Sequence, residues 1–157
     1  MADIRAYDPA ADYAALRACF VDLQSWERRL EPSMPEPETV AEPYLADMLA
    51  RCAATGGRVF VAEAAGAVIG FVCVMARVMP DLDDAPEPYA YISDLVVRAA
   101  HRGRGTGRRL IDRAASFARE NGVGQLKVGV LVRNEGAHAL YRDCGFRDYR
   151  IELVRQL

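Results

Sequence analysis

The feature that most constrains the fold is a strand that runs directly into a glycine-rich turn and then into a helix. The strand is expected over residues 89–97, glycine stands at positions 103, 105 and 107, and an apolar stripe of helical spacing follows to Asn121. Glycine lets the backbone take unusual dihedrals and approach a ligand closely. Open N–H groups in such a turn and at the start of a helix bind anions. Between Arg98 and Arg113 there are six arginines and one acid, Asp112. A diphosphate is therefore the expected ligand.

Two common phosphate sites fit this turn poorly. A Walker loop ends in Gly-Lys-Ser/Thr, whereas Gly107 is followed by Arg108 and Arg109. A dinucleotide-binding turn needs Gly-x-Gly-x-x-Gly, and Arg108 stands where the third glycine belongs after Gly103 and Gly105. Glycine spacing alone leaves the ligand undecided.

The rest of the chain predicts a mixed sheet covered by helices. Asp8 and Pro9 are typical of a helix start, three prolines interrupt residues 25–39, and a second helix is expected over about 40–52. Strands are expected over residues 4–7, 58–63, 68–78, 89–97, 125–132 and 146–154. The predicted fold is a single α/β (α+β) domain over residues 1–157. Its central sheet has about six to seven strands and is flanked by four helices, in the order β-α-α-β-β-β-α-β-α-β.

Composition favours a cytoplasmic globular protein with no membrane or nucleic-acid partner. A chain of 157 residues and 17.3 kDa suits one domain, and no apolar run approaches the ~20 residues of a membrane span. The N-terminus lacks the pattern of a signal peptide. The arginine cluster is local and the pI is near 5.7, which disfavours a nucleic-acid binder. Four widely spaced cysteines and two histidines predict buried thiols and no metal.

Charge divides the chain into two unlike parts. Residues 1–97 hold 16 acids and 7 bases, whereas residues 98–157 hold 6 acids and 13 bases. A basic part suits an anionic ligand and an acidic part suits a cationic one.

Two motifs resemble those of the GNAT superfamily of N-acetyltransferases. The segment Arg102-Gly103-Arg104-Gly105-Thr106-Gly107 resembles the family's Arg/Gln-x-x-Gly-x-Gly/Ala motif, and it follows Leu95-Val96-Val97 as that motif follows the family's central strand. A downstream segment resembles the family's Asn-x-x-Ala-x-x-Leu-Tyr-x-x-x-Gly-Phe pattern, with matches at Asn134, Ala137, Leu140, Tyr141, Gly145 and Phe146. The detailed resemblance covers about residues 89–150.

The resemblance implies acetyl-coenzyme A as cosubstrate and direct attack by an amine, without a covalent enzyme intermediate or a metal. It assigns residues 1–88 to an acceptor-side half and residues 89–157 to an acetyl-coenzyme A-binding half. Backbone groups of Leu95 and Val97 would pair with the pantetheine arm, and Tyr141 would be the general acid for the departing thiolate. The implied contacts to the cosubstrate come from Leu95, Val96, Val97, Arg102, Gly103, Arg104, Gly105, Thr106, Gly107, Arg108, Asn134 and Tyr141.

Two candidates for the general base precede Leu95. Successive residues of a strand face opposite sides, so only one of Ser93 and Asp94 is expected to face the acceptor. Asp94 is the better base, Ser93 would orient a water molecule, and bulk water is a third route.

The acceptor is expected to be a small-molecule or peptide amine that meets the acidic half, and its identity stays open. The residues that could surround a cationic amine are Trp26, Glu27, Glu31, Asp81, Asp83, Asp84 and Glu87. An equally good interpretation is that they belong to solvated loops, with Trp26 as an anchor. A non-catalytic acetyl-coenzyme A sensor, a partner-binding module and a nucleotide-binding enzyme are the alternatives. A homodimer through the last strands or the hairpin is also expected from the family.

Overall fold

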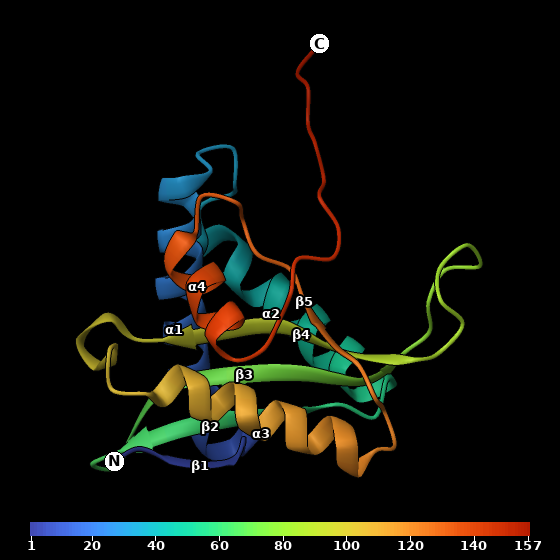
Figure 1. Cartoon of the computed structure of the whole chain (residues 1–157). Helices are drawn as coiled ribbons and strands as arrows, with labels where there is room; N and C mark the ends of the chain where they lie inside the picture. Colours follow the sequence, from blue (N-terminus) through green and yellow to red (C-terminus); the bar gives the residue numbers. More distant parts are fainter.

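The computed structural model describes all 157 residues, and they form one five-stranded sheet with four α-helices (Figure 1). The elements in chain order are β1 (Asp3–Ala6), α1 (Pro9–Leu30), α2 (Pro37–Ala54), β2 (Arg58–Ala64), β3 (Ala67–Val78), β4 (Tyr89–Val97), the 3-10 turn η1 (Ala99–His101), α3 (Thr106–Glu120), β5 (Leu126–Val128) and α4 (Glu135–Asp143). None of the helices has the length and apolarity to span a membrane. The predicted α/β class and the four helices are confirmed.

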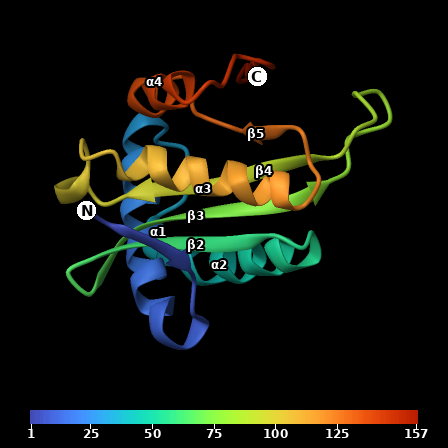
Figure 2. The ribbon, with the colours of Figure 1, turned by 60° about the horizontal axis from the view of Figure 1, so that its bottom comes forward.

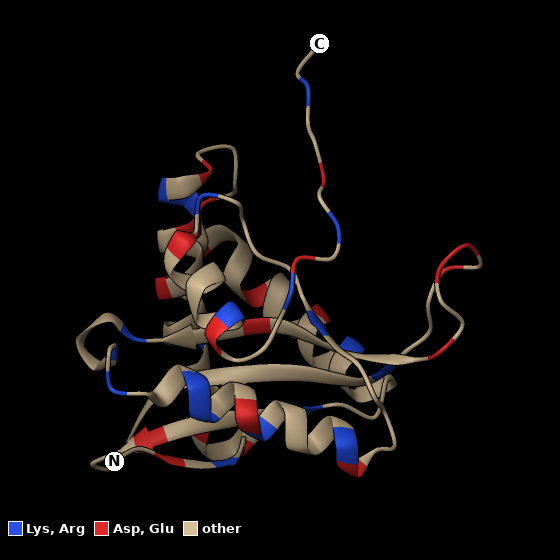
Figure 3. Ribbon diagram, in the orientation of Figure 1, with Lys and Arg blue, Asp and Glu red and all other residues tan.

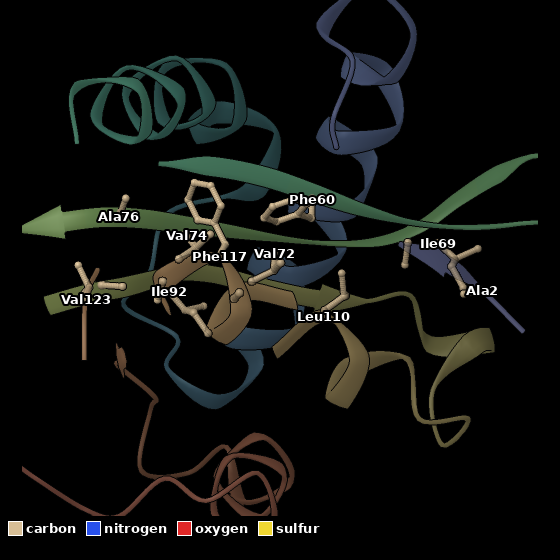
Figure 4. Close-up of a cluster of buried hydrophobic side chains, with 14 residues drawn as sticks. Ala2, Phe60, Ile69, Val72, Val74, Ala76, Ile92, Leu110, Phe117 and Val123 are labelled. Carbon is tan, nitrogen blue, oxygen red and sulfur yellow. The ribbon is translucent and has the colours of Figure 1, made fainter. Parts of the chain in front are cut away.

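The strands stand in chain order across the sheet, antiparallel except for the parallel pair of β4 and β5. Helix α3 covers one face, and α1 and α2 cover the other (Figure 2). Each face has its own core. Leu110, Ala114 and Phe117 of α3 pack on one face (Figure 4), and Leu16 of α1 and Leu45 of α2 pack on the other.

Helix spacing explains these cores. Leu110, Ala114 and Phe117 recur at intervals of four and three residues, which aligns them along one side of α3. The ring of Phe117 meets Phe60 edge-on, with 5.6 Å between centroids. A fully buried leucine or phenylalanine side chain stabilises the fold by about 1.5–3 kcal/mol. Cys19, Cys52 and Cys73 are buried free thiols, as predicted, and Cys144 is half-buried.

Helix α1 is longer than the sequence prediction. Its N-cap Asp8 accepts a hydrogen bond from the Ala10 N–H at 2.9 Å, and Pro9 follows at the first helical position. The helix then continues through the predicted break at residue 25 and ends at Leu30. The reason is that the first proline of the segment is Pro32, which disfavours helical dihedrals only from the residue before it. Residues 25–30 are therefore helical.

Strand β4 contains an extra residue at Ser93. Across the ladder Ile92 pairs with Val74 and Asp94 pairs with Cys73, so Ser93 has no partner on β3. This is a β-bulge, which locally increases strand twist. Ile92 packs in the core under α3, whereas Val96 packs in the core under α1 and α2. Simple alternation would put these two residues on the same face, so the bulge changes which side chains share a face.

The expected last strand over residues 146–154 is absent, and so the sheet has five strands instead of six to seven. Tyr149 and Arg150 instead contact Asp84 in the 79–88 loop. Beyond them the chain leaves the domain (Figure 1), and Ile151, Leu153 and Val154 are 81%, 90% and 92% exposed. A strand needs a neighbour to satisfy its backbone groups, and the tail has none.

Candidate active site

A cavity lies where β4 and β5 stop pairing. Their parallel ladder ends at the pair Ile92–Val128, one residue before the bulge. Beyond that point a cavity of about 170 Å³ lies among α1, α2, α4 and the two diverging strands. Its lining combines apolar residues with seven that carry polar groups: Gln24, Glu27, Tyr44, Ser93, Asp94, Asn134 and Tyr141.

The backbone of β4 past the bulge is available on its β5 side. The Arg98 N–H donates to the Ile69 carbonyl of β3 at 2.8 Å. Because hydrogen-bonded pairs alternate along an antiparallel ladder, the backbone groups of Leu95 and Val97 point away from β3, toward the gap. The Val97 carbonyl accepts a hydrogen bond from Arg102 Nε at 2.8 Å. These are the groups that the sequence predicts for a pantetheine contact.

Val96 lies differently. It pairs with Phe71 across the ladder and is 4% exposed within the core under α1 and α2. Its backbone groups face β3, by the same alternation. The fold therefore does not bring Val96 to the gap, although it was among the predicted contacts.

The glycine-rich turn has the backbone of an anion site. Gly103 and Gly105 adopt φ values of 72° and 77°, where other residues are strained, and the space beside each Cα is open. Gly105 is the N-cap of α3 and provides no side-chain cap, so the first N–H groups of the helix stay available. Thr106 is buried at the start of the helix, and Gly107 fits closely against Leu140. A phosphate fits this turn through backbone donors.

Basic residues lie along the chain around the turn, at the end of β4 and the start of α3 (Figure 3). Arg102 lies over the Trp26 ring, 5.8 Å from its centroid. Arg108 donates to the Asp143 carbonyl, whereas Arg104 is exposed. The site therefore combines open N–H groups with a positive surrounding field.

Helix α4 contributes Asn134 and Tyr141. Asn134 is the N-cap, and its Oδ1 accepts a hydrogen bond from the Ala137 N–H at 3.3 Å, which leaves its amide nitrogen for a ligand. Tyr141 is 7% exposed and lines the cavity, and its ring meets Phe146 edge-on at 5.6 Å. Burial raises the pKa of the Tyr141 hydroxyl, as do the charges of Glu27 and Asp94. The hydroxyl is therefore protonated at neutral pH and can donate a hydrogen bond.

The two residues around the bulge both line the cavity. Asp94 is 6% exposed, and its Oδ1 accepts a hydrogen bond from the Tyr44 hydroxyl at 2.9 Å. Its Oδ2 has no hydrogen-bond partner, nor does the Ser93 hydroxyl. Burial raises the pKa of Asp94, and the neighbouring hydroxyls of Ser93 and Tyr44 oppose that shift. The expectation that only one of the pair faces this space is wrong, because the bulge breaks the alternation on which it was based.

The acceptor side of the cavity includes one predicted acid and omits the others. Glu27, in the last turn of α1, lines the cavity. Asp84 in the 79–88 loop lies at the opposite end of β4, where Lys127 and Arg150 pair with it. Glu31 binds Ser33 outside the cavity. Tyr44 of α2 was not among the predicted site residues, because nothing in its helical spacing separates a core tyrosine from one that holds a carboxylate.

The arrangement places a hydroxyl donor, Tyr141, and a carboxylate acceptor, Asp94, around one small cavity, and the glycine-rich turn follows the strand that lines this cavity. No group of three or more His, Cys, Asp or Glu side chains is placed to hold a metal ion. Such a site can bind a ligand with a diphosphate at one end and move protons at the other.

Comparison with known proteins agrees with this geometry. The profile of the acetyltransferase (GNAT) family matches residues 20–146. Streptothricin acetyltransferase from Streptomyces lavendulae is 47% identical over 55 residues, which are 35% of this chain and 29% of that protein. The chain thus spans less than a third of the length of that relative.

Solved structures match over almost the whole chain. A putative acetyltransferase from Agrobacterium tumefaciens is 28% identical with a TM-score of 0.65, over 98% of this chain and 99% of that one. The aminoglycoside N-acetyltransferase AAC(6')-Iy, in complex with a bisubstrate analogue, has a TM-score of 0.73 at 20% identity, over 100% and 99% of the two chains. The second likeness concerns the fold alone.

Proposed function

The chain belongs to the acetyltransferase (GNAT) family, and from that premise we propose that it transfers the acetyl group of acetyl-coenzyme A to an amine. The observation that carries this proposal is that β4 leads from the cavity lined by Asp94 and Tyr141, along an edge with no β5 partner, to the glycine-rich turn. When bound, acetyl-coenzyme A supplies an activated acetyl thioester.

The donor half is proposed to bind the cosubstrate mainly through its backbone. The turn from Gly103 to Arg108 offers N–H groups to the pyrophosphate, and Leu95 and Val97 offer backbone groups to the pantetheine arm. The Val97 carbonyl already accepts a bond from Arg102, so its N–H is the freer partner. Asn134 adds an amide donor beside the cavity.

Two side chains are proposed to move protons. Asp94 accepts a proton from the acceptor's ammonium group, because a neutral amine is the nucleophile. The amine nitrogen then bonds to the acetyl carbon, and the bond from that carbon to sulfur breaks. Tyr141 donates its hydroxyl proton or a hydrogen bond to the sulfur and regains a proton from the nitrogen. The raised pKa of Tyr141 favours the hydrogen bond over complete transfer.

A coenzyme A sensor without catalysis is the second candidate, since the same turn serves both functions. We expect calorimetry to show binding of acetyl-coenzyme A and coenzyme A and no binding of ATP or NAD. Release of free thiol that depends on an added amine would distinguish the enzyme from the sensor. Preference for ATP or NAD would contradict both.

A homodimer stays a proposal. It is supported by the exposed tail, in which Tyr149, Ile151 and Leu153 alternate as strand residues do, and by the outer edge of β5, which has no neighbour. The proposed occupant of that edge is the tail of a second copy. Sedimentation of the full chain and of a chain ending at Arg150 tests it: a dimer and a monomer are expected, respectively.

A further inference from the structure

Two carboxylates face the cavity without a cation to neutralise them. Asp94 is 6% exposed and its Oδ2 has no partner. Glu27 takes part in none of the ion pairs of the chain. The pKa values of both carboxyl groups are raised, chiefly by burial, and the charge of Asp94 adds to the shift at Glu27. Both groups line the same cavity, and neither has a basic partner there.

Nearby basic side chains are engaged elsewhere. Arg28 pairs with Glu36 at 2.6 Å and Arg51 pairs with Asp47 at 2.7 Å. Arg29 lies over the Trp26 ring. The charge of Arg51 lowers the pKa of Asp94 only as the smallest of several influences. The protein therefore does not neutralise the pair itself.

The location of Glu27 is unfavourable for an anion on its own. It lies in the last turn of α1, which ends at Leu30, and the C-terminal end of a helix carries partial negative charge. A carboxylate that is half-buried, near a second carboxylate and at this end of a helix is destabilised unless a cation joins it.

The rest of the lining selects the form of that cation. Phe20, Leu23 and Met34 surround the acceptor side of the cavity with apolar surface. The Phe20 ring stacks on Tyr44, with 4.6 Å between centroids, and so fixes the tyrosine that holds Asp94. A small cavity that combines these apolar side chains with two carboxylates matches an ammonium group on an aliphatic stem.

We propose that Glu27 and Asp94 together bind the ammonium group of an aliphatic primary amine, and that Glu27 sets specificity for amines without a neighbouring carboxylate. This inference rests on the proposed acetyl transfer. Asp94 takes one ammonium proton, which leaves a neutral amine. Glu27 stays ionised and stabilises the positive charge that returns to the nitrogen when it bonds to the acetyl carbon, until a second proton leaves and the nitrogen becomes an amide. An α-amino acid would place its own carboxylate against Glu27, so its amine is excluded.

Binding can be tested without the reaction. The full chain, saturated with coenzyme A, is titrated with butylammonium, butanol and butyrate and followed by ¹H–¹⁵N NMR. Butylammonium is expected to bind at least tenfold more tightly than the two others, and Glu27→Gln is expected to weaken it at least tenfold. Glu38→Gln is the control: it removes the same charge from α2 at a side chain that is 70% exposed and outside the cavity, and should change affinity less than twofold.

Each outcome bears on one of the two proposals. Equal binding of butyrate, or unchanged affinity in Glu27→Gln, overturns the carboxylate pair. Acetyl transfer to butylamine is then compared with transfer to glycine: transfer that is indifferent to Glu27→Gln also overturns the pair but leaves acetyl transfer standing. Butylammonium binding that requires Glu27, without transfer to any amine, would leave the site standing and overturn the proposed function.

Discussion

The two sides of the cavity are built from different materials. The donor side consists of backbone: two glycines with positive φ, the start of α3 and the unpaired edge of β4. The acceptor side consists of side chains from three elements, Glu27 on α1, Tyr44 on α2 and Asp94 on β4. Backbone recognition of this kind can be predicted from sequence, because glycine is strongly favoured at those dihedrals. Side chains that the fold brings together from distant elements form no regular spacing in the sequence, so they cannot be recognised from it.

If the donor side depends on backbone, Gly105→Glu should have the largest effect. A glutamate at φ 77° is strained and adds a negative charge where a pyrophosphate is expected. We expect calorimetry to show at least ~100-fold weaker coenzyme A binding, about 2.7 kcal/mol.

The matched control is Gly124→Glu, since Gly124 has equally open surroundings but no positive φ and lies beyond α3. It should bind coenzyme A within twofold of the native affinity. Equal loss in both variants would show that charge or folding, and not the turn, is responsible.

Substitutions on the acceptor side should have the reverse effect: they should lower the rate of acetyl transfer and leave coenzyme A affinity unchanged. Asp94→Asn keeps an oxygen for the Tyr44 hydroxyl but cannot accept a proton. We expect kcat/KM for an amine to fall by about 100-fold, with coenzyme A affinity unchanged, as measured by thiol release and calorimetry. A native rate in this variant would assign the base to water.

Tyr141→Phe should have a smaller effect, because coenzyme A thiolate is a stable leaving group, with a thiol pKa near that of cysteine at about 8.5. Loss of one hydrogen-bond donor should lower kcat by roughly tenfold. Pre-steady-state thiol release measures the chemical step directly. An unchanged step would leave Tyr141 as a packing residue against Phe146.

The smallest expected effect is on stability. The pKa of Asp94 is raised in the folded chain, so its contribution to stability is fully present below the unfolded pKa and is lost as pH rises through the folded pKa. Asp94→Asn should therefore stabilise the protein near pH 8, by about 1 kcal/mol or ~3 °C in Tm. Thermal melts from pH 8 downward should show this gain shrinking. If Asp94→Asn raised the stability equally at every pH, the gain would not come from removing a buried charge.

The predictable parts of the molecule are those with local causes. The positive-φ glycines, the Asp8 cap and the apolar side of α3 all follow from neighbouring residues, and each was recognisable in the sequence. The extent of α1 was underestimated, and with it the placement of Glu27 on a helix, because three prolines were taken to act over the whole segment. The last strand was overpredicted, since alternation at residues 149–153 shows a capacity for pairing and cannot provide a partner.

Because Ser93 is an extra residue in β4, the geometry of the site depends on the number of residues in that strand. Without it, Ile92 and Asp94 would be consecutive and would still face opposite sides of the sheet, as they do now. The core would keep its side chains, but the added twist at which β4 and β5 part would be lost. Loss of one codon could thus close the gap without any change to the core, whereas a substitution at the same position would leave the gap in place. The gap beside β4 therefore depends on the number of residues in β4 more than on which residue stands at position 93.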